Sequence, residues 1–280
     1  MSEFVKRTIS GTIFVACIVT CILWNQWTVS GLVLLISLLA VDEFHRLVKS
    51  HILQRICAAM GTTVLWLMCV FQSFPMTLAF AAIYLPIIVM SLLDEIWNHT
   101  EDPLRVWGNM LISQAMIAFP LCTMLFLYDL DKWILLALFV LIWVNDTGAY
   151  CVGSLTAKRP KGNHKMTPHI SPKKSWEGLC GGIVFTLIAG IILYFYGWFD
   201  AVDANKYTIC FAILFALTTS LFGTMGDLME SLFKRSLGIK DSGHFMPGHG
   251  GVLDRFDSIL LAAPILTSLS WLCYYLVPLL

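Results

Sequence analysis

The stretch KWILLALFVLIWVNDTGAYC, residues 132–151, indicates whether this chain folds in water or in lipid. Residues 133–144 are all apolar, so they form a block instead of the spaced stripe of an amphipathic helix. Apolar runs of about 18–20 residues match the length of a helix that crosses a bilayer. Lipid is the solvent that tolerates such blocks on many helices at once. The stretch therefore predicts a membrane-spanning helix.

The composition of the whole chain agrees with this prediction. Of its 280 residues, 58% are hydrophobic and 13% are charged, and the mean hydropathy is +0.77. A soluble domain of this length needs more charge to cover its surface. The nine cysteines lie within or at the ends of apolar blocks and form no CxxC pair, so we interpret them as small membrane-core residues. We expect an all-α integral membrane protein.

Apolar blocks like the one above recur along the chain. The first follows Lys6 and Arg7 and could be a signal peptide, but no small-residue cleavage site comes after it. Trp24 and Trp27 instead indicate an interfacial belt around a tight hairpin. We predict about nine transmembrane helices, at residues 8–24, 27–41, 52–73, 76–93, 106–128, 132–151, 179–199, 207–226 and 258–280.

The basic residues predict the orientation of these spans. With the N-terminus in the cytoplasm, 16 of the 18 basic residues are cytoplasmic, and only Lys132 and Lys206 are not. This positive-inside bias places the C-terminus on the opposite side. The long connections, residues 152–178 and 227–257, then face the cytoplasm, where we expect the functional site. We treat residues 1–280 as one polytopic membrane domain.

Two polar clusters interrupt the apolar pattern before residue 180. Asp146 lies in an apolar helix, where an ionised side chain costs about 2.5–3.5 kcal/mol. A salt bridge to a neighbouring helix would explain it, but we favour a metal or substrate contact. The loop from Lys158 to Gly178 has six basic residues and one acidic residue. Ordinary loop charge could explain some of them. Lys173 and Lys174, between Pro172 and Trp176, suit a phosphate chain.

The third cluster follows the eighth predicted span. If that helix continues beyond the membrane, one face carries Asp227, Glu230, Ser231 and Lys234. Glu230 and Lys234 alone could form a plain salt bridge. The glycine-rich turn 248–251, with His249 as a positioned hydrogen-bond donor, allows backbone amides to approach a ligand.

Two further aspartates stand at the start of the last predicted span. Asp254 and Asp257 lie one helical turn apart, and aspartates supply hard oxygen ligands while lysines and arginines contact phosphates. The mixture in this cluster indicates Mg²⁺ and a nucleoside triphosphate. The chain has no GxxxxGK[ST] P-loop and no zinc-site spacing.

The order of these residues resembles the signature of one family, the phosphatidate cytidylyltransferases (CDP-diglyceride synthases). Met246 and Ser175 are mild departures from the family pattern, and residues 153–165 depart more. The signature is filled by Ser231, Lys234, Arg235, Lys240, Asp241, Gly243, Pro247, His249, Gly250, Gly251, Asp254, Arg255 and Asp257.

This resemblance implies that the protein joins CTP to phosphatidic acid, giving CDP-diacylglycerol and pyrophosphate. It implies Mg²⁺ as cofactor, a homodimer, and a site open to the cytoplasm and to membrane lipid. The catalytic half would be residues 131–280, and residues 1–130 would form the N-terminal spans. Whether a monovalent cation joins Mg²⁺ is left open. We expect no nucleic-acid partner, and a bacterial inner membrane as the location.

Each candidate site residue then has an expected role. The catalytic set is Asp227, Asp254, Lys234 and Arg235. The metal ligands are Asp227, Asp254, Asp146, Glu230 and Asp257. The substrate contacts are Ser171, Lys173, Lys174, Glu177, Ser231, Lys240, Asp241, His249, Gly250, Gly251 and Arg255.

Two other functions fit part of the sequence. A CTP-dependent polyprenol or lipid kinase would need a general base, and His249 is the candidate. A transporter would place its polar groups near the membrane midplane, often in paired repeats, whereas here they lie at helix ends. A phosphatidyltransferase that uses CDP-diacylglycerol would need paired Asp-Gly motifs, and the chain has no Asp-Gly dipeptide.

Overall fold

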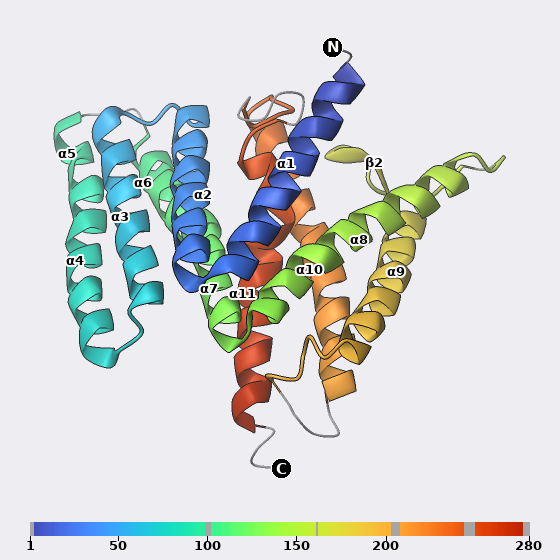
Figure 1. Ribbon diagram of the computed structural model, residues 1–280. Helices are drawn as coiled ribbons and strands as arrows, with labels where there is room; N and C mark the ends of the chain where they lie inside the picture. The colour runs from blue at the N-terminus through green and yellow to red at the C-terminus, as the bar shows by residue number, and fades with distance from the viewer. Residues whose placement is uncertain (1–2, 99–101, 161, 203–207, 244–249, 277–280) are drawn as a thin grey trace. The chain divides into compact units, whose positions relative to one another are not determined.

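The structure is a computed structural model in which almost all elements are helices (Figure 1). It describes residues 3–98, 102–160, 162–202, 208–243 and 250–276. His249 therefore lies outside the described residues, as do Pro247 and Met246.

The predicted all-α membrane fold is confirmed. Within the described ranges, eight helical segments are long and apolar enough to cross a membrane. The first predicted span corresponds to helix α1 (Glu3–Trp24), whose apolar part, Thr8–Trp24, is shorter. The eight segments are α2 (Gln26–Leu47), α3 (Ile52–Val70), Phe74–Trp97, Pro103–Leu130, α8 (Lys132–Ala157), α9 (Trp176–Phe195), α10 (Thr208–Ser236) and Leu253–Tyr275. The side of the membrane on which each terminus lies stays a prediction.

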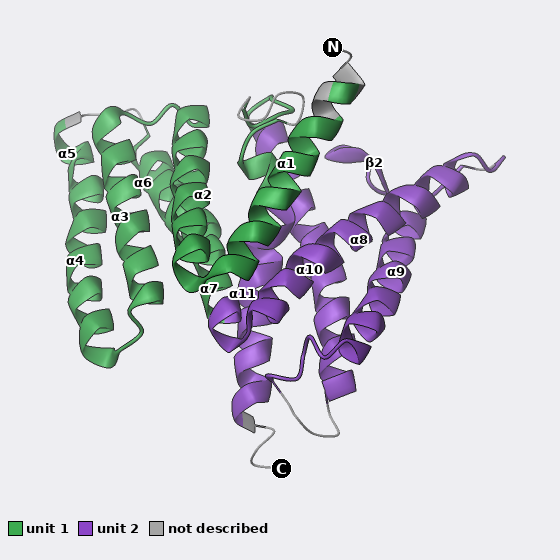
Figure 2. Cartoon of the chain, in the orientation of Figure 1, with its two compact units in different colours: residues 1–126, 237–256 green, residues 127–236, 257–280 purple. Residues whose placement is uncertain are grey.

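The chain forms two compact units (Figure 2). Unit 1 contains residues 1–126 and 237–256, and unit 2 contains residues 127–236 and 257–280. Helices α7 (Phe119–Leu130) and α11 (Leu253–Leu276) contribute residues to both units. Whether the chain acts as a single domain stays a prediction.

Unit 1 starts with a tight helical hairpin. Asn25 ends α1 and caps α2, because its Oδ1 accepts a hydrogen bond from Thr28 N at 2.9 Å and its own N–H donates to Thr28 Oγ1 at 3.3 Å. This is the turn predicted from Trp24 and Trp27, and both tryptophans are exposed. Further along come α4 (Phe74–Leu93), α5 (Glu95–Asn98) and α6 (Pro103–Ile112).

A π-helical segment joins α6 to α7 in unit 1. This segment, η1 (Ser113–Ala118), is bound to two other helices by buried polar side chains. Gln114 Nε2 donates to Ala58 O on α3 at 3.1 Å. On α2, His45 Nε2 lies 2.9 Å from Ser113 Oγ. These contacts supply polar partners where the helix winding departs from the regular pattern.

Unit 2 is built around α8, α9 and α10, which pack through small residues. A side chain at Gly181 on α9 would place its Cβ 2.4 Å from Val152 of α8, and one at Gly190 would meet Ala216 of α10 at 2.7 Å. Close backbone approach of this kind is how helices associate in lipid. Between α8 and α9 lies an antiparallel hairpin, β1 (Lys165–Thr167) and β2 (Ser171–Ser175).

Several helices continue beyond the predicted spans on the side with long connections, as the sequence analysis considered for the eighth span. Helix α8 ends at Ala157 instead of residue 151, α10 ends at Ser236 instead of 226, and α11 begins at Leu253 instead of 258. The connections 152–178 and 227–257 are correspondingly shorter, and the first contains the hairpin. Hydropathy measures only the part of a helix that matches lipid, so it ends a span where the residues become polar, although the helix continues.

Candidate active site

Asn145 links the helices of unit 2 at the point where the polar part of α8 begins. It is buried, its Oδ1 accepts a hydrogen bond from Ser220 Oγ, and its Nδ2 donates to Thr224 Oγ1 at 3.5 Å. Gly182 on α9 leaves room for it, because a Cβ there would lie 2.5 Å from Asn145 Oδ1. Three helices therefore meet at this amide, and the next residue, Asp146, is exposed toward a cavity.

This cavity has a volume of about 250 Å³ and lies wholly within unit 2. It brings together residues from all three polar clusters of the sequence. Asp146 comes from α8, Lys173 and Lys174 from β2, and Asp227 from α10. The remaining lining residues are Asn145, Ala149, Tyr150, Met166, Ser175, Gly178, Leu179 and Thr224.

An ion pair joins the hairpin to α10 at the cavity wall. Lys174 Nζ lies 2.6 Å from Asp227 Oδ2 and donates to Thr224 O at 3.2 Å. Ser231, one turn along α10, donates to Asp227 Oδ1 at 3.4 Å. The carboxylate is thus held in one orientation from two sides, and the lysine is held beside it. Ser175 completes the junction, because its Oγ caps α9 by accepting from Gly178 N at 3.1 Å.

A second carboxylate group extends this site toward α11. Asp257 is half-buried, and its Oδ1 accepts a hydrogen bond from Ser258 N at 2.6 Å. The close approach depends on Gly226, because a Cβ there would lie 2.5 Å from Asp257 O. The geometry gathers acidic side chains from three helices into one region of unit 2.

The carboxylates of this region are donors of the kind that suits a divalent cation, but among the described residues only His51, Asp94 and Glu95 of unit 1 hold three ligand atoms within 4.8 Å of one another. Carboxylate oxygens are the ligands that Mg²⁺ prefers, and mutual repulsion among them is relieved when a cation binds. The cavity brings together Asp146 and Asp227, which are two of the five predicted ligands. Glu230 and Asp257 lie on α10 and α11 in unit 2, and their membership of one metal site stays a prediction. Glu230 also pairs with Lys234, as the plain salt-bridge alternative for these two residues predicts.

The fifth predicted ligand, Asp254, lies in unit 1. Its Oδ2 accepts hydrogen bonds from Ser242 N at 2.9 Å and Gly251 N at 2.8 Å. Gly250 has a φ of +86°, a conformation that favours glycine. Because Asp227 belongs to unit 2, a shared metal site of Asp227 and Asp254 stays a prediction.

The other predicted substrate contacts are distributed over both units. Arg235 Nε donates to Ile170 O at 3.2 Å, so this side chain contacts the turn of the hairpin. Ser171 begins β2 and is half-buried. Lys240, Asp241 and Arg255 are exposed in unit 1, so their predicted contacts with substrate are not tested by the geometry of unit 2.

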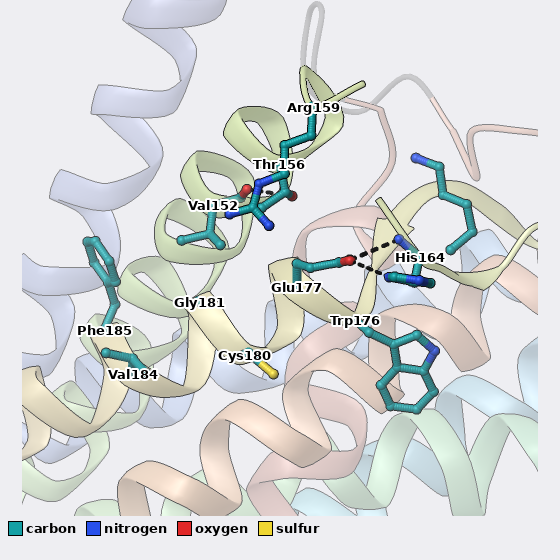
Figure 3. Close-up of a pocket in the computed structure, with 11 residues that line it drawn as sticks. Val152, Thr156, Arg159, His164, Trp176, Glu177, Cys180, Gly181, Val184 and Phe185 are labelled. Carbon is teal, nitrogen blue, oxygen red and sulfur yellow. Dashed lines mark hydrogen bonds and ion pairs between the residues drawn. The ribbon is translucent and has the colours of Figure 1, made fainter. Parts of the chain in front are cut away.

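Glu177 faces a different cavity from the one that Lys174 lines (Figure 3). Its carboxylate accepts from His164 N, with 3.0 Å to each oxygen, and Oε1 lies 2.7 Å from His164 Nδ1. This larger cavity, about 880 Å³, is walled mainly by apolar side chains of α8 and α9, including Val152 and Phe185. In this geometry Glu177 joins the start of the hairpin to the start of α9.

Sequence reasoning missed Glu43 and a cluster of one histidine and two acidic residues, all in unit 1. Glu43 on α2 accepts three hydrogen bonds from the segment before and at the start of α11. His51, Asp94 and Glu95 hold ligand atoms within 4.8 Å of one another, with His51 Nε2 2.8 Å from Glu95 Oε1 and Nδ1 3.5 Å from Asp94 Oδ2. Acidic residues at the end of a span are also typical of interfacial charge, so neither group was distinctive.

Comparison with known proteins identifies the family. Residues 5–273 match the sequence model of the cytidylyltransferase family. The chain belongs to the cytidylyltransferase family. This confirms the resemblance that the signature residues carry.

Members of this family in staphylococci are similar to part of the chain. A phosphatidate cytidylyltransferase of Staphylococcus haemolyticus (strain JCSC1435) is 46% identical over 131 residues, 47% of this chain and 46% of the relative. One from Staphylococcus aureus (strain COL) is 44% identical over 131 residues, with the same coverage. One from Staphylococcus epidermidis (strain ATCC 12228) is 43% identical over 138 residues, 49% of this chain and 48% of the relative. The chain spans about half the length of these curated relatives.

Proposed function

We propose that this protein is a CTP:phosphatidate cytidylyltransferase, which makes CDP-diacylglycerol and pyrophosphate for phospholipid biosynthesis. The observation that carries the proposal is the cavity of unit 2, where Asp146 and Asp227 face Lys173 and Lys174 at the end of apolar helices. Acidic and basic groups side by side suit a reaction between two polyanions, because one set binds a cation and the other binds phosphate.

The reaction needs little help from a base. The nucleophile is the phosphate of phosphatidic acid, whose second pKa is about 6, so it is largely ionised near neutral pH. Its oxygen attacks the α-phosphorus of CTP, a new phosphorus–oxygen bond forms, and the bond to the β-phosphate oxygen breaks. Pyrophosphate leaves with the electron pair. The obstacle is charge repulsion between the two reactants, so electrostatic stabilisation carries most of the catalysis.

The basic side chains of the hairpin would reduce this repulsion. Lys174 is held by Asp227 and by Thr224 O, so its ammonium group is in place before substrate arrives. Lys173 lines the same cavity and is exposed. We assign to both lysines the binding of substrate phosphate. Arg235 and Lys234 would add positive charge at the end of α10.

The acidic side chains would hold the metal ion. We propose Mg²⁺, with Asp227, Asp146, Asp257 and Glu230 as its residues in unit 2. When bound, the ion neutralises phosphate charge and orients the phosphate chain. Asp227 is kept in one orientation by Ser231 and Lys174, so it is ready to receive a cation.

We also propose the setting in which the reaction occurs. The bacterial relatives and the apolar helices support a bacterial plasma membrane. The positive-inside split of the basic residues supports a site that faces the cytoplasm, where CTP is available. A homodimer is implied by the family resemblance. Neither the lipid-kinase nor the transporter alternative is supported by the family match.

The test is an assay of the purified protein in detergent with CTP, phosphatidic acid and Mg²⁺. We expect equal amounts of pyrophosphate and CDP-lipid, and no product when EDTA is added. Release of CDP together with a newly phosphorylated lipid alcohol would favour the kinase alternative. A protein that never consumes CTP under these conditions contradicts the proposed function.

A further inference from the structure

A carboxylate of α2, far from the signature in sequence, organises the segment that leads into α11. Glu43 Oε1 accepts hydrogen bonds from the Ser242 hydroxyl and from Leu253 N, the latter at 3.2 Å. Its Oε2 accepts from Val252 N at 2.8 Å. All of these residues belong to unit 1. One side chain therefore satisfies three donors of a segment about two hundred residues later in the chain.

The glycines of this segment fit around the same carboxylate. A Cβ on Gly251 would lie 2.1 Å from Glu43 Oε1, and one on Gly243 would lie 2.9 Å from Oε2. Contacts below 3.0 Å are not tolerated by real side chains. Gly251 is part of the signature, and the structure gives a reason for it: a larger residue would displace Glu43.

The contacts also stabilise the N-terminus of α11. The first amides of a helix have no partner within the helix, and its N-terminus carries partial positive charge. Val252 N and Leu253 N are taken by Glu43, and Gly251 N by Asp254. Two carboxylates from different elements thus stabilise one helix start.

Ser242 connects the two carboxylates. Its hydroxyl donates to Glu43 and its backbone N–H donates to Asp254 Oδ2 at 2.9 Å. The orientation of Asp254 therefore depends on where Ser242 is held, and Glu43 holds it. In the same region, Phe256 of α11 packs edge-on against Phe14 of α1, with ring centroids 5.6 Å apart.

We propose that Glu43 is a positioning residue for the cytidylyltransferase reaction. It fixes Ser242, Val252 and Leu253 so that Asp254 and the exposed Arg255 are presented in a defined geometry at the start of α11. This inference rests on the proposed function. It assigns a role to the N-terminal half, which the signature does not cover.

The neighbouring residue provides a matched control. Asp42 is on the same turn of α2 and carries the same charge, but it pairs with Arg46 at 2.7 Å and Arg55 at 2.5 Å. Asp42→Asn removes the same charge as Glu43→Gln while leaving the contacts to Ser242, Val252 and Leu253 intact.

The experiment combines steady-state kinetics with hydrogen–deuterium exchange on the full-length protein. In Glu43→Gln the amide nitrogen faces N–H donors, so we expect kcat to fall about 10–100-fold, with a much smaller change in KM for CTP. Amide exchange in peptides covering 242–243 and 250–253 should speed up, while exchange in α8 and α10 stays as in wild type. Glu43→Asp keeps the charge and should recover part of kcat, and Asp42→Asn should match wild type in both readouts.

The following results would overturn the positioning role of Glu43 or the proposed function. Wild-type kcat in Glu43→Gln, or unchanged exchange in the segment, overturns the positioning role. Equal effects in Asp42→Asn overturn it too, because the charge on α2 would then matter and the contacts would not. If wild-type protein makes no CDP-lipid, the proposed function fails with the catalytic part of this inference, and exchange alone decides whether Glu43 holds the segment.

Discussion

The carboxylates of the two units have different partners, although both sets come from the ends of apolar helices. In unit 1, Glu43 and Asp254 accept hydrogen bonds from backbone N–H groups, which fix a segment of chain. In unit 2, Asp227 pairs with Lys174 and lines a cavity with Asp146. The first arrangement satisfies groups of the protein itself. The second gathers negative charge beside a cavity, so it is suited to bind a cation and phosphate.

The largest effect is expected at Asp227, which pairs with Lys174 at the cavity of unit 2. Asp227→Asn keeps the size of the side chain but removes its charge, so we expect kcat to fall about 10²–10³-fold. Kinetics with CTP and phosphatidic acid measure this, and a thermal melt of the purified variant controls for folding. Near-normal turnover would remove Asp227 from the site.

The partner of Asp227 should matter somewhat less. Lys174→Met removes one ammonium group from the cavity, and a hydrogen bond to a charged group is worth about 1.5–3 kcal/mol, or about tenfold to hundredfold in kcat/KM. Because the two residues contact each other, Lys174→Met should cost less in an Asp227→Asn background than alone. Strictly additive losses in the double-mutant cycle would show that the ion pair has no role in the reaction.

Packing between α10 and α11 offers a test by stability. Gly226→Ala places a Cβ 2.5 Å from Asp257 O, so the helices must separate, at a cost of about 1–3 kcal/mol. Gly223→Ala, one turn earlier, meets only Ser258 Cβ at 3.6 Å and should be tolerated. Thermal unfolding in detergent compares the two. Equal melting temperatures would mean that α10 and α11 do not approach as closely as described.

The smallest effect is expected at the link between the hairpin and α9. His164→Ala removes a contact whose imidazole is largely exposed, and exposed ion pairs contribute about 0–1 kcal/mol. We expect a slightly lower melting temperature and kcat within about threefold of wild type. A loss as large as that of Lys174→Met would instead place Glu177 and His164 in the reaction, as the sequence predicted for Glu177.

Much of the site could be predicted because it depends on local spacing. The period of a helix puts Asp227 and Ser231 on one face, and the structure joins them by a hydrogen bond. The same period pairs Glu230 with Lys234. The apolar blocks gave the number and order of the helices, because lipid requires continuous apolar length. The helices extend past the predicted spans because polar residues can continue a helix beyond the lipid.

The long-range contacts could not be predicted from this one sequence. Lys174 and Asp227 are separated by the whole of α9, and nothing in their spacing shows that β2 reaches α10. In the sequence Glu43 resembles any interfacial charge, and only the structure shows its contacts with Ser242, Val252 and Leu253. The hairpin was missed because its strands are short and polar, without the alternation of a half-buried strand.

The central claim is that Asp227 and the carboxylates near it in unit 2 bind a divalent cation, whereas Glu43 in unit 1 holds a segment of the chain. Electron paramagnetic resonance with Mn²⁺ as a substitute for Mg²⁺ tests this directly on purified protein. We predict that wild type binds Mn²⁺, that Asp227→Asn weakens this binding at least about tenfold, and that Asp42→Asn leaves it unchanged. Identical Mn²⁺ binding by wild type and Asp227→Asn, or no binding by wild type, would contradict the account.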